Sequence, residues 1–250
     1  MTAGTAVITG AASERGIGRG LARRLAREGW ALALIDLDGD GAEALAASLR
    51  SEGVAAIGAG ADITDADAVD RAIRRAESEL PPITALANIA GISDPTPFLE
   101  LDRERWDRVI EVNLTGTFVV TRRVVPGMVE RRYGRVVCLS STAAQTGGGN
   151  YSTSAYAAAK AGIEGMARGV AREVAPHGVT VNCISPATID TDIMGGPIVG
   201  ERLPRFLASL PVGRLGTVDD VSALMSFLLG PESGYITGAT VNINGGLRIG

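Results

Sequence analysis

The chain has 250 residues, of which 46% are hydrophobic and 4% aromatic, and it carries a formal net charge of −4. This length and composition suffice for one large α/β domain, and the sequence has no run of Lys or Arg that would indicate a nucleic-acid partner. Every apolar run is far shorter than the roughly 20 residues that span a membrane, and the N-terminus lacks the features of a secretory signal, so we expect a cytoplasmic protein.

Strand-like runs alternate with helical patterns along the whole chain. Because these runs are too apolar to show a solvent-facing side, they indicate a parallel sheet covered by helices on both faces. Right-handed crossovers make such an α/β fold doubly wound. The seven predicted strands cover residues 5–9, 31–35, 55–61, 84–89, 135–139, 179–184 and 239–243.

No linker, repeat or low-complexity tract divides the sequence, which predicts a single domain over residues 1–250. The longest irregular segment, residues 187–216, is rich in proline and glycine. Loops of this length in compact domains are often active-site lids, and this one follows the carboxyl end of a predicted strand, where ligands bind in such sheets. We therefore expect a substrate lid at about residues 187–216.

The first predicted strand runs into a glycine-rich turn that opens a helix. Gly10, Gly16 and Gly18 let the backbone approach a pyrophosphate, and the N-terminus of the helix offers free N–H groups to it. The order of strand, turn and helix predicts a dinucleotide site at this end of the chain.

Asp36 ends the second strand at close to the spacing of about 20 residues at which a carboxylate meets the adenosine ribose. A carboxylate accepts hydrogen bonds from a free 2′-hydroxyl but repels a 2′-phosphate, which favours NAD over NADP. Arg15 in the glycine-rich loop is contrary evidence, because a guanidinium can pair with that phosphate. No Lys or Arg follows Asp36 in the stretch IDLDGDGAE, so NAD is the expected cofactor and NADP the lesser alternative.

His177 is the only histidine, which excludes Ser-His triads and histidine metal clusters, and we expect no metal site. Proton transfer must then use another group. Tyr156 and Lys160 are four residues apart and share a helix face. Such pairs are common by chance, so this spacing alone does not show whether the pair is catalytic or part of an ordinary helix surface.

Several motifs, in this order, resemble those of the short-chain dehydrogenase/reductase family over almost the whole chain. They are the glycine motif Thr9 to Gly18, the pair Asp62 and Ile63, the stretch Asn88 to Gly91, the tetrad Asn113, Ser141, Tyr156 and Lys160, and the segment Pro186 to Thr191. Together they are far more specific than a single glycine motif. The resemblance implies a Rossmann fold and an NAD(P)-dependent oxidoreductase acting on CH–OH groups.

The resemblance also implies which residues form the site. Asn113, Ser141, Tyr156 and Lys160 would be catalytic. The cofactor-binding positions would be Gly10, Ser13, Arg15, Gly16, Ile17, Gly18, Asp36, Asp62, Ile63, Asn88, Ala90, Gly91, Tyr156, Lys160, Pro186, Ile189 and Thr191.

The sequence departs from the family pattern at several points. The glycine loop has five residues between Gly10 and Gly16 where the usual pattern has three, and Ile89 replaces an Asn. The interval between Ser141 and Tyr156 is two residues longer than in most members, which leaves Ser140 and Ser154 as rivals for the catalytic serine. Ser141 is preferred because it follows a strand directly and can be held rigidly at the carboxyl edge of the sheet.

The expected chemistry depends on the pKa of Tyr156. A free phenol has a pKa near 10, so a base at neutral pH requires a shift of roughly three units, which a partly desolvated Lys160 could supply. Tyr156 would then take the alcohol proton in the oxidising direction and return it in the reducing direction, while Ser141 holds the substrate oxygen. By resemblance, Lys160 also binds the nicotinamide ribose, and Asn113 positions a helix break and a water for proton relay.

The substrate pocket is expected to be largely apolar, with a few hydroxyls and no cationic clamp, which favours a small or medium-sized neutral secondary alcohol or ketone. Its predicted wall comprises Ser93 to Phe98, Tyr151, Met194, Ile198 and Phe206. The main alternative is an NADPH-dependent 3-oxoacyl-(acyl-carrier-protein) reductase, for which Arg132 fits one basic docking position while His177 replaces another. A non-catalytic dinucleotide sensor and a nucleotide-sugar epimerase are the remaining alternatives.

The family resemblance further implies a homotetramer, with helices near residues 103–132 and 155–175 pairing between subunits. Ala157, Ala161 and Ala171 permit close helix approach, although packing within the subunit explains them equally well.

Overall fold

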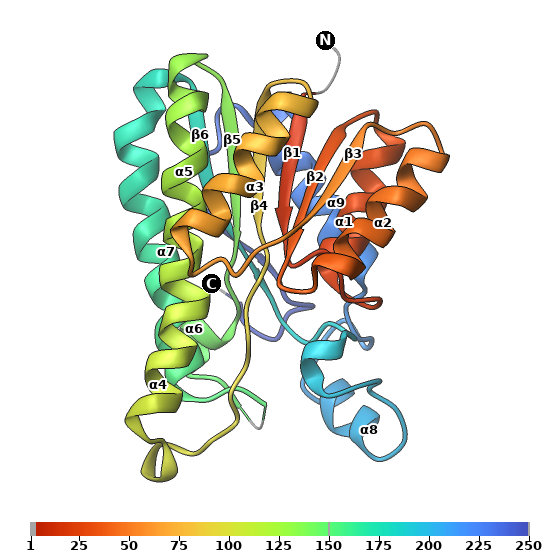
Figure 1. The fold of residues 1–250 in the computed structure, drawn as a ribbon. Coiled ribbons are helices and arrows are strands. Elements are labelled where there is room, and N and C mark those ends of the chain that lie inside the picture. The colour runs from red at the N-terminus through yellow and green to blue at the C-terminus, as the bar shows by residue number, and fades with distance from the viewer. Residues whose placement is uncertain (1–3, 150, 250) are drawn as a thin grey trace.

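In the computed structural model, which describes residues 4–149 and 151–249 apart from the side chain of Met194, the chain forms one doubly wound α/β domain (Figure 1). All seven strands lie in a single parallel sheet with the order β3-β2-β1-β4-β5-β6-β7. The sequence-based prediction of the fold is confirmed, with strand limits that differ by one or two residues. The strands are β1 Thr5–Thr9, β2 Ala31–Asp36, β3 Ala56–Gly60, β4 Ile83–Asn88, β5 Gly134–Leu139, β6 Val179–Pro186 and β7 Thr240–Ile243.

Helices cover both faces of the sheet, as the fully apolar strands require. One buried core lies between the sheet and α3, α5 and α7, and the other lies between the sheet and α1, α2 and α9. Within the described residues the helices are α1 Ile17–Arg27, α2 Gly39–Ser51, α3 Ala66–Glu79, α4 Arg103–Ile110, α5 Gly116–Glu130, α6 Ala143–Thr146, α7 Ser154–Val174, α8 Arg202–Leu207 and α9 Val218–Leu229.

Small residues allow the helices to lie close to the sheet. A Cβ on Gly58 of β3 would lie 2.3 Å from the Cα of Glu43 in α2, so only glycine permits this approach. Helix starts are fixed by side chains that accept otherwise unpaired backbone N–H groups. Asp65 caps α3 by accepting from the N–H groups of Asp67 and Ala68, and Thr217 forms a reciprocal capping box with Asp220 at α9.

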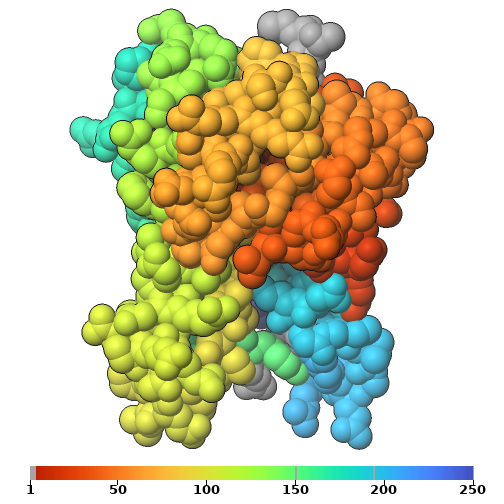
Figure 2. All heavy atoms as spheres, viewed as in Figure 1, coloured from red at the N-terminus to blue at the C-terminus, as the bar shows by residue number. Residues whose placement is uncertain are grey.

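The strand order reverses between β1 and β4, and in such sheets ligands bind beyond the carboxyl ends of the strands at this point. Two lobes extend below this edge in the view of Figure 1, one carrying α4 and the other carrying α8. Figure 2 shows a hollow between the two lobes. Within the described part of the chain, no helix is long and apolar enough to cross a membrane.

Candidate active site

A groove of about 810 Å³ runs along the carboxyl edge of the sheet at the switch point. It brings together residues that are far apart in the sequence, including most of the predicted cofactor positions. The predicted residues on its wall are Gly10, Ser13, Gly16, Ile17, Asp36, Asp62, Ile63, Ala90, Gly91 and Thr191. A groove of this size, built from these segments, fits an extended dinucleotide.

The glycine loop places the N-terminus of α1 against the end of β1. Gly10 has a φ of +72°, which favours glycine, and a Cβ on Gly18 would lie 2.2 Å from the carbonyl oxygen of Gly10. The helix can approach the strand this closely because Gly18 lacks a side chain, whereas a Cβ on Gly10 would lie 2.9 Å from the backbone of Ala90. The start of α1 thus lies on the wall of the groove, where its first N–H groups can bind a phosphate oxygen.

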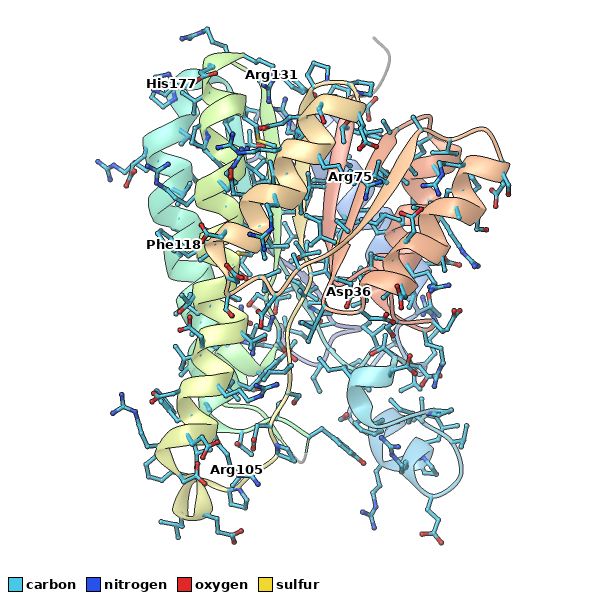
Figure 3. The ribbon with its side chains drawn as sticks, viewed as in Figure 1. Asp36, Arg75, Arg105, Phe118, Arg131 and His177 are labelled. Carbon is cyan, nitrogen blue, oxygen red and sulfur yellow. The ribbon has the colours of Figure 1, made fainter. Side chains whose placement is uncertain are left out.

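Asp36 stands at the end of β2, on the edge of the sheet that faces the α8 lobe (Figure 3). Its Oδ2 accepts a 2.8 Å hydrogen bond from the backbone N–H of Ala12, and its Oδ1 accepts one of 3.1 Å from the N–H of Asp38. The carboxylate thus holds the glycine loop and lines the groove at the same time.

Arg15 does not face the groove. Its guanidinium pairs with Asp190 at 2.6 Å and lies 3.7 Å from Asp192, both in the segment 187–216. Arg15 therefore pairs with two aspartates that were not among the predicted site residues, and not with an open position for a 2′-phosphate. No signal along the chain indicates a pair separated by 175 residues.

Asn88 also differs from its predicted role as a groove residue. Its side chain is buried and donates hydrogen bonds to Thr121 Oγ1 at 2.9 Å and to Cys138 Sγ at 3.6 Å. Asn88 therefore ties β4 to α5 and β5 within the core, and the residues that follow it, Ile89 to Gly91, line the groove instead.

A second, smaller pocket of about 280 Å³ adjoins the groove, and Ile17, Leu139, Thr191 and Ile193 line both. Ser141 and Tyr156 lie on its wall, together with Pro186 and Ile189 of the predicted nicotinamide segment. Because the pocket and the groove adjoin, a substrate bound in the pocket would lie next to a cofactor bound in the groove.

Three neighbouring serines take different places. The Ser140 hydroxyl is buried and donates to Glu164 Oε1 at 2.7 Å, away from the pocket. Ser154 lies at the start of α7 and does not line the pocket, and its buried hydroxyl has no hydrogen-bond partner among the described residues. Ser140 and Ser141 both belong to the pocket wall, but of the three only the Ser141 hydroxyl lies within hydrogen-bonding reach of the Tyr156 phenol.

Tyr156 and Lys160 lie on one face of α7, both almost fully buried. Burial raises the pKa of Tyr156 to about 12, and the nearby Ser141 hydroxyl acts in the opposite direction. Burial also lowers the pKa of Lys160 to about 8. The ammonium lies 5.4 Å from the centre of the Tyr156 ring and donates a 2.8 Å hydrogen bond to the carbonyl oxygen of Leu139.

In the protein without a bound cofactor, the pKa of Tyr156 is raised, whereas a partly desolvated Lys160 was expected to bring it towards neutrality. Desolvation of the phenol is the main cause of the raised pKa of Tyr156, and burial also destabilises the charged form of Lys160. The protein's own groups keep Tyr156 protonated at neutral pH, as a proton donor.

Asn113 lies in a π-helical turn, Glu111–Thr115, between α4 and α5. Its Nδ2 donates to the carbonyl oxygens of Ile92 and Val109, each at 2.9 Å, while its buried Oδ1 has no partner among the described residues. A Cβ on Gly91 would lie 2.4 Å from this Oδ1 and 3.6 Å from Lys160 Nζ, so Gly91 leaves room between the groove and both groups. π-Helical turns occur frequently at functional sites.

The pocket wall agrees only partly with the sequence expectation. Ser93, Tyr151 and Phe206 line it, and the Tyr151 and Phe206 rings stack with centres 5.6 Å apart. Phe98 is 71% exposed and Ile198 is buried elsewhere, so neither lines the pocket, and the Met194 side chain lies outside the described part of the structure. The sequence analysis also missed Arg202, whose guanidinium lies 5.0 Å from the Tyr151 ring.

The two candidate carrier-docking positions lie far from the pocket of their own subunit. Figure 3 shows His177 at the upper end of the molecule, well away from Asp36, which lies near mid-height. Arg132 lies at the same end, because the Arg132 guanidinium donates to the carbonyl oxygen of Pro176, the residue before His177. Within one chain, therefore, neither Arg132 nor His177 lines the groove or the pocket.

Comparison with known proteins identifies the chain. A family model described as "Enoyl-(Acyl carrier protein) reductase" matches residues 10–248. A relative from Sinorhizobium fredii, "Uncharacterized short-chain type dehydrogenase/reductase y4mP", is 38% identical over 98% of this chain and 97% of its own length. The chain belongs to the short-chain dehydrogenase/reductase family. It is therefore an NAD(P)-dependent oxidoreductase, and the groove and pocket form the candidate active site of such an enzyme.

Two further relatives of this short-chain dehydrogenase/reductase differ in their named reactions. The 2-(S)-hydroxypropyl-CoM dehydrogenase 3 of Xanthobacter autotrophicus is 38% identical over 93% of this chain and 92% of its own length. A crystal structure of a 3-oxoacyl-[acyl-carrier protein] reductase with bound NAD from Brucella melitensis has a TM-score of 0.89 and 32% identity, covering 98% of this chain and 91% of that one. The shared fold is therefore compatible with more than one substrate class.

Proposed function

We propose that this enzyme prefers NAD and interconverts a small, neutral secondary alcohol and the corresponding ketone. The observation that carries the proposal is the position of Ser141 and Tyr156, side by side on the wall of a pocket that opens into the groove beside Asp36. Carbonyl reduction requires a proton donor and a second hydroxyl next to the position of the cofactor, and this arrangement provides both.

The cofactor would be held by the glycine loop and Asp36. The N–H groups at the start of α1 would bind the pyrophosphate, and the Asp36 carboxylate, which lines the groove from the end of β2, would meet the adenosine ribose. When it is bound, the oxidised nicotinamide accepts a hydride from the alcohol, and the reduced nicotinamide donates one to the ketone. Lys160 and Thr191 would orient the nicotinamide end, and Asp62 and Ile63 would contact the adenine end.

Tyr156 would move the proton. In the reducing direction its phenol, which stays protonated at neutral pH, donates to the substrate oxygen while Ser141 donates a second hydrogen bond to the same atom. In the oxidising direction Tyr156 must first lose its proton, and the Lys160 ammonium favours that anion. The buried Oδ1 of Asn113, which has no partner among the described residues, could hold a relay water behind Lys160.

Residues 187–216 would act as the lid over this site. The segment contributes Thr188, Ile189, Phe206 and Ser209 to the pocket and Thr191 and Asp192 to the groove. Closure of such a segment excludes water from the reacting centre, which strengthens the electrostatic interactions inside it.

The substrate class follows from the size and lining of the pocket. About 280 Å³ suits a small molecule, and the wall consists of alanines, aliphatic and aromatic side chains, and several serine and threonine hydroxyls. The name of the Xanthobacter relative refers to a hydroxypropyl group, which is a secondary alcohol. This supports a secondary alcohol or ketone as the reacting group.

A substrate panel tests the proposal. Secondary alcohols, cyclic diols, sugars and 3-oxoacyl thioesters are assayed with each of the four dinucleotides by the absorbance of the reduced nicotinamide. We expect turnover with a neutral alcohol or ketone and with NAD or NADH. A preference of more than about tenfold for a thioester with NADPH would reject the proposal.

The second candidate is a 3-oxoacyl-(acyl-carrier-protein) reductase, because the Brucella structure at a TM-score of 0.89 carries that name. The remote location of Arg132 and His177 within the subunit speaks against a docking surface at the mouth of the same chain. A non-catalytic dinucleotide sensor would have no need for Ser141 and Tyr156 in one pocket, and the absence of any turnover in the panel would favour it.

We further propose a homotetramer in which α4, α5 and α7 contact a second copy. Phe118 of α5 is 51% exposed, and Gly165 and Gly169 of α7 would have open space around an added Cβ. Ala161 is exposed, whereas Ala157 and Ala171 are buried in their own subunit. Light scattering of the purified protein that shows only a monomer would reject this assembly.

A further inference from the structure

Two carboxylates of the segment 187–216 bind the glycine loop. Asp192 Oδ2 accepts a 2.8 Å hydrogen bond from the Ser13 hydroxyl and one of 3.3 Å from the backbone N–H of Arg15. Asp190 Oδ1 pairs with the Arg15 guanidinium at 2.6 Å. The hydroxyl, the amide and the guanidinium of the loop are thus all directed at carboxylates of the same chain.

Asp190 is held in place from a second side. The backbone N–H of Ile198 donates to its Oδ1 at 3.0 Å, and this hydrogen bond, together with Arg15, keeps the pKa of Asp190 below its usual value. The carboxylate therefore stays ionised at neutral pH. Its position next to Arg15 is fixed by the fold of the segment as well as by the ion pair.

The donors involved are those that bind phosphate. A hydroxyl, a loop N–H and a guanidinium form short, charge-assisted hydrogen bonds with phosphate oxygens, and a guanidinium is especially suited to this geometry. Ser13 and Asp192 line the same groove as Asp36, so the Ser13 hydroxyl lies beside the position proposed for the adenosine ribose. The Arg15 guanidinium does not line the groove itself, but it lies 3.7 Å from Asp192 and pairs with Asp190. The loop thus carries an anion site that the protein itself fills.

We propose that Asp190 and Asp192 are specificity-determining residues that occupy the anion site of the glycine loop and so exclude the 2′-phosphate of NADP. This inference rests on the proposed dinucleotide groove. A 2′-phosphate entering the site would have to displace Asp192 from Ser13 and Arg15, and would meet Arg15 already neutralised by Asp190. It would also face the negative charge of Asp36. NAD, with a neutral 2′-hydroxyl, makes none of these demands.

The side chains involved are a third to a half exposed: 32% for Arg15, 38% for Asp190 and 46% for Asp192. Ion pairs at such sites contribute little to the stability of a fold. Their effect should therefore appear in the choice between two ligands that differ by one phosphate, and hardly at all in thermal stability.

The test is a binding measurement on the full chain with Asp190→Asn and Asp192→Asn combined. The dissociation constants of NADH and NADPH are measured by fluorescence titration, and those of 5′-AMP and adenosine 2′,5′-bisphosphate by calorimetry. We expect NADPH and the bisphosphate to bind at least about tenfold more tightly than to the wild type, with NADH and 5′-AMP changed by less than about threefold.

Two controls separate the mechanism from a general change of charge. Adding Arg15→Ala to the double variant should abolish the gain, because the freed guanidinium is the group that receives the phosphate. Glu201→Gln removes an exposed acid from the same segment just before α8 and should leave the selectivity unchanged.

Three outcomes would overturn the inference. They are an unchanged preference in the double variant, an equal gain in Glu201→Gln, and an equal loss of affinity for both dinucleotides, which would mean that the contacts only hold the segment closed. Failure of the wild type to bind any dinucleotide would instead reject the proposed function.

Discussion

The hydroxyl of Ser140 donates a 2.7 Å hydrogen bond to the carboxylate of Glu164, one helical turn beyond Lys160 on α7, while the adjacent Ser141 faces the pocket. Both partners of the hydrogen bond are buried, Ser140 at 2% and Glu164 at 8% exposure. The bond fixes the end of β5 against α7, so that the two successive serines face opposite ways. One serine is thereby structural and the other is available for the substrate.

The two serines should respond differently to removal of the hydroxyl. Ser141→Ala should lower kcat by a factor of about 10² to 10³ with little change in stability, because it removes a donor to the developing charge. Ser140→Ala should leave the buried Glu164 without its donor, lower the free energy of unfolding by about 2 kcal/mol and the Tm by roughly 5 °C, and spare most of the turnover. Steady-state kinetics and thermal unfolding of both variants check this contrast.

The result would contradict the assignment if Ser140→Ala lost turnover while Ser141→Ala kept it. Ser154→Ala is the matched control, since this hydroxyl has no hydrogen-bond partner among the described residues and does not line the pocket. The Ser154→Ala substitution should change neither kcat nor the Tm appreciably.

Tyr156→Phe should keep dinucleotide binding and lose at least about a thousandfold in turnover, because it removes only the proton donor from an otherwise unchanged pocket. The measurements are the NADH dissociation constant by fluorescence and kcat with the best substrate of the panel. Retention of a tenth or more of the wild-type kcat would rule out Tyr156 as the acid and base.

Lys160→Met should lose turnover without losing stability at pH 7. The lowered pKa of Lys160, about 8 against an ordinary 10.5, means that burial of the ammonium disfavours the folded state by roughly 3 kcal/mol at neutral pH. Methionine removes this cost and also removes the hydrogen bond to Leu139, which contributes about 1 to 3 kcal/mol in the opposite sense. The Tm should therefore change by only a few degrees.

The same residue predicts how stability depends on pH. The folded protein releases the Lys160 proton near pH 8 and the unfolded chain near 10.5, so the cost of the buried charge is full below pH 8 and disappears as the pH rises towards 10.5. Between pH 7 and 10 the wild type should gain about 2 kcal/mol relative to Lys160→Met. Denaturant titrations of both proteins measure this difference, and parallel curves would refute it.

Asp36→Asn should weaken the preference for NAD over NADP by about 10- to 100-fold while the loop keeps its conformation, because the amide oxygen can still accept from the N–H of Ala12. Asp36→Ala removes this acceptor as well and should also weaken NAD binding. Titrations with NADH and NADPH separate the effect of charge from that of loop anchoring. If both variants retain the wild-type selectivity between NADH and NADPH, Asp36 does not determine which of the two binds.

The sequence by itself determined the fold and the location of the site along the chain. Seven apolar runs alternating with helical patterns fix a parallel sheet, and the ends of parallel strands must meet at one edge, which brings Gly10, Asp36, Gly91 and Ser141 together without any knowledge of contacts. These features depend on local periodicity and short motifs, which a linear sequence displays directly.

Only the tertiary structure decided where individual side chains point and what their surroundings do to them. Asn88 faces the core instead of the groove, Arg15 is turned to Asp190, and Tyr156 is held protonated by burial. Each outcome depends on atoms contributed by distant segments: the direction of a side chain is set by the packing around it, and a pKa by the desolvation and charges that this packing creates. No spacing along the chain encodes these quantities, because they arise when the segments are brought together.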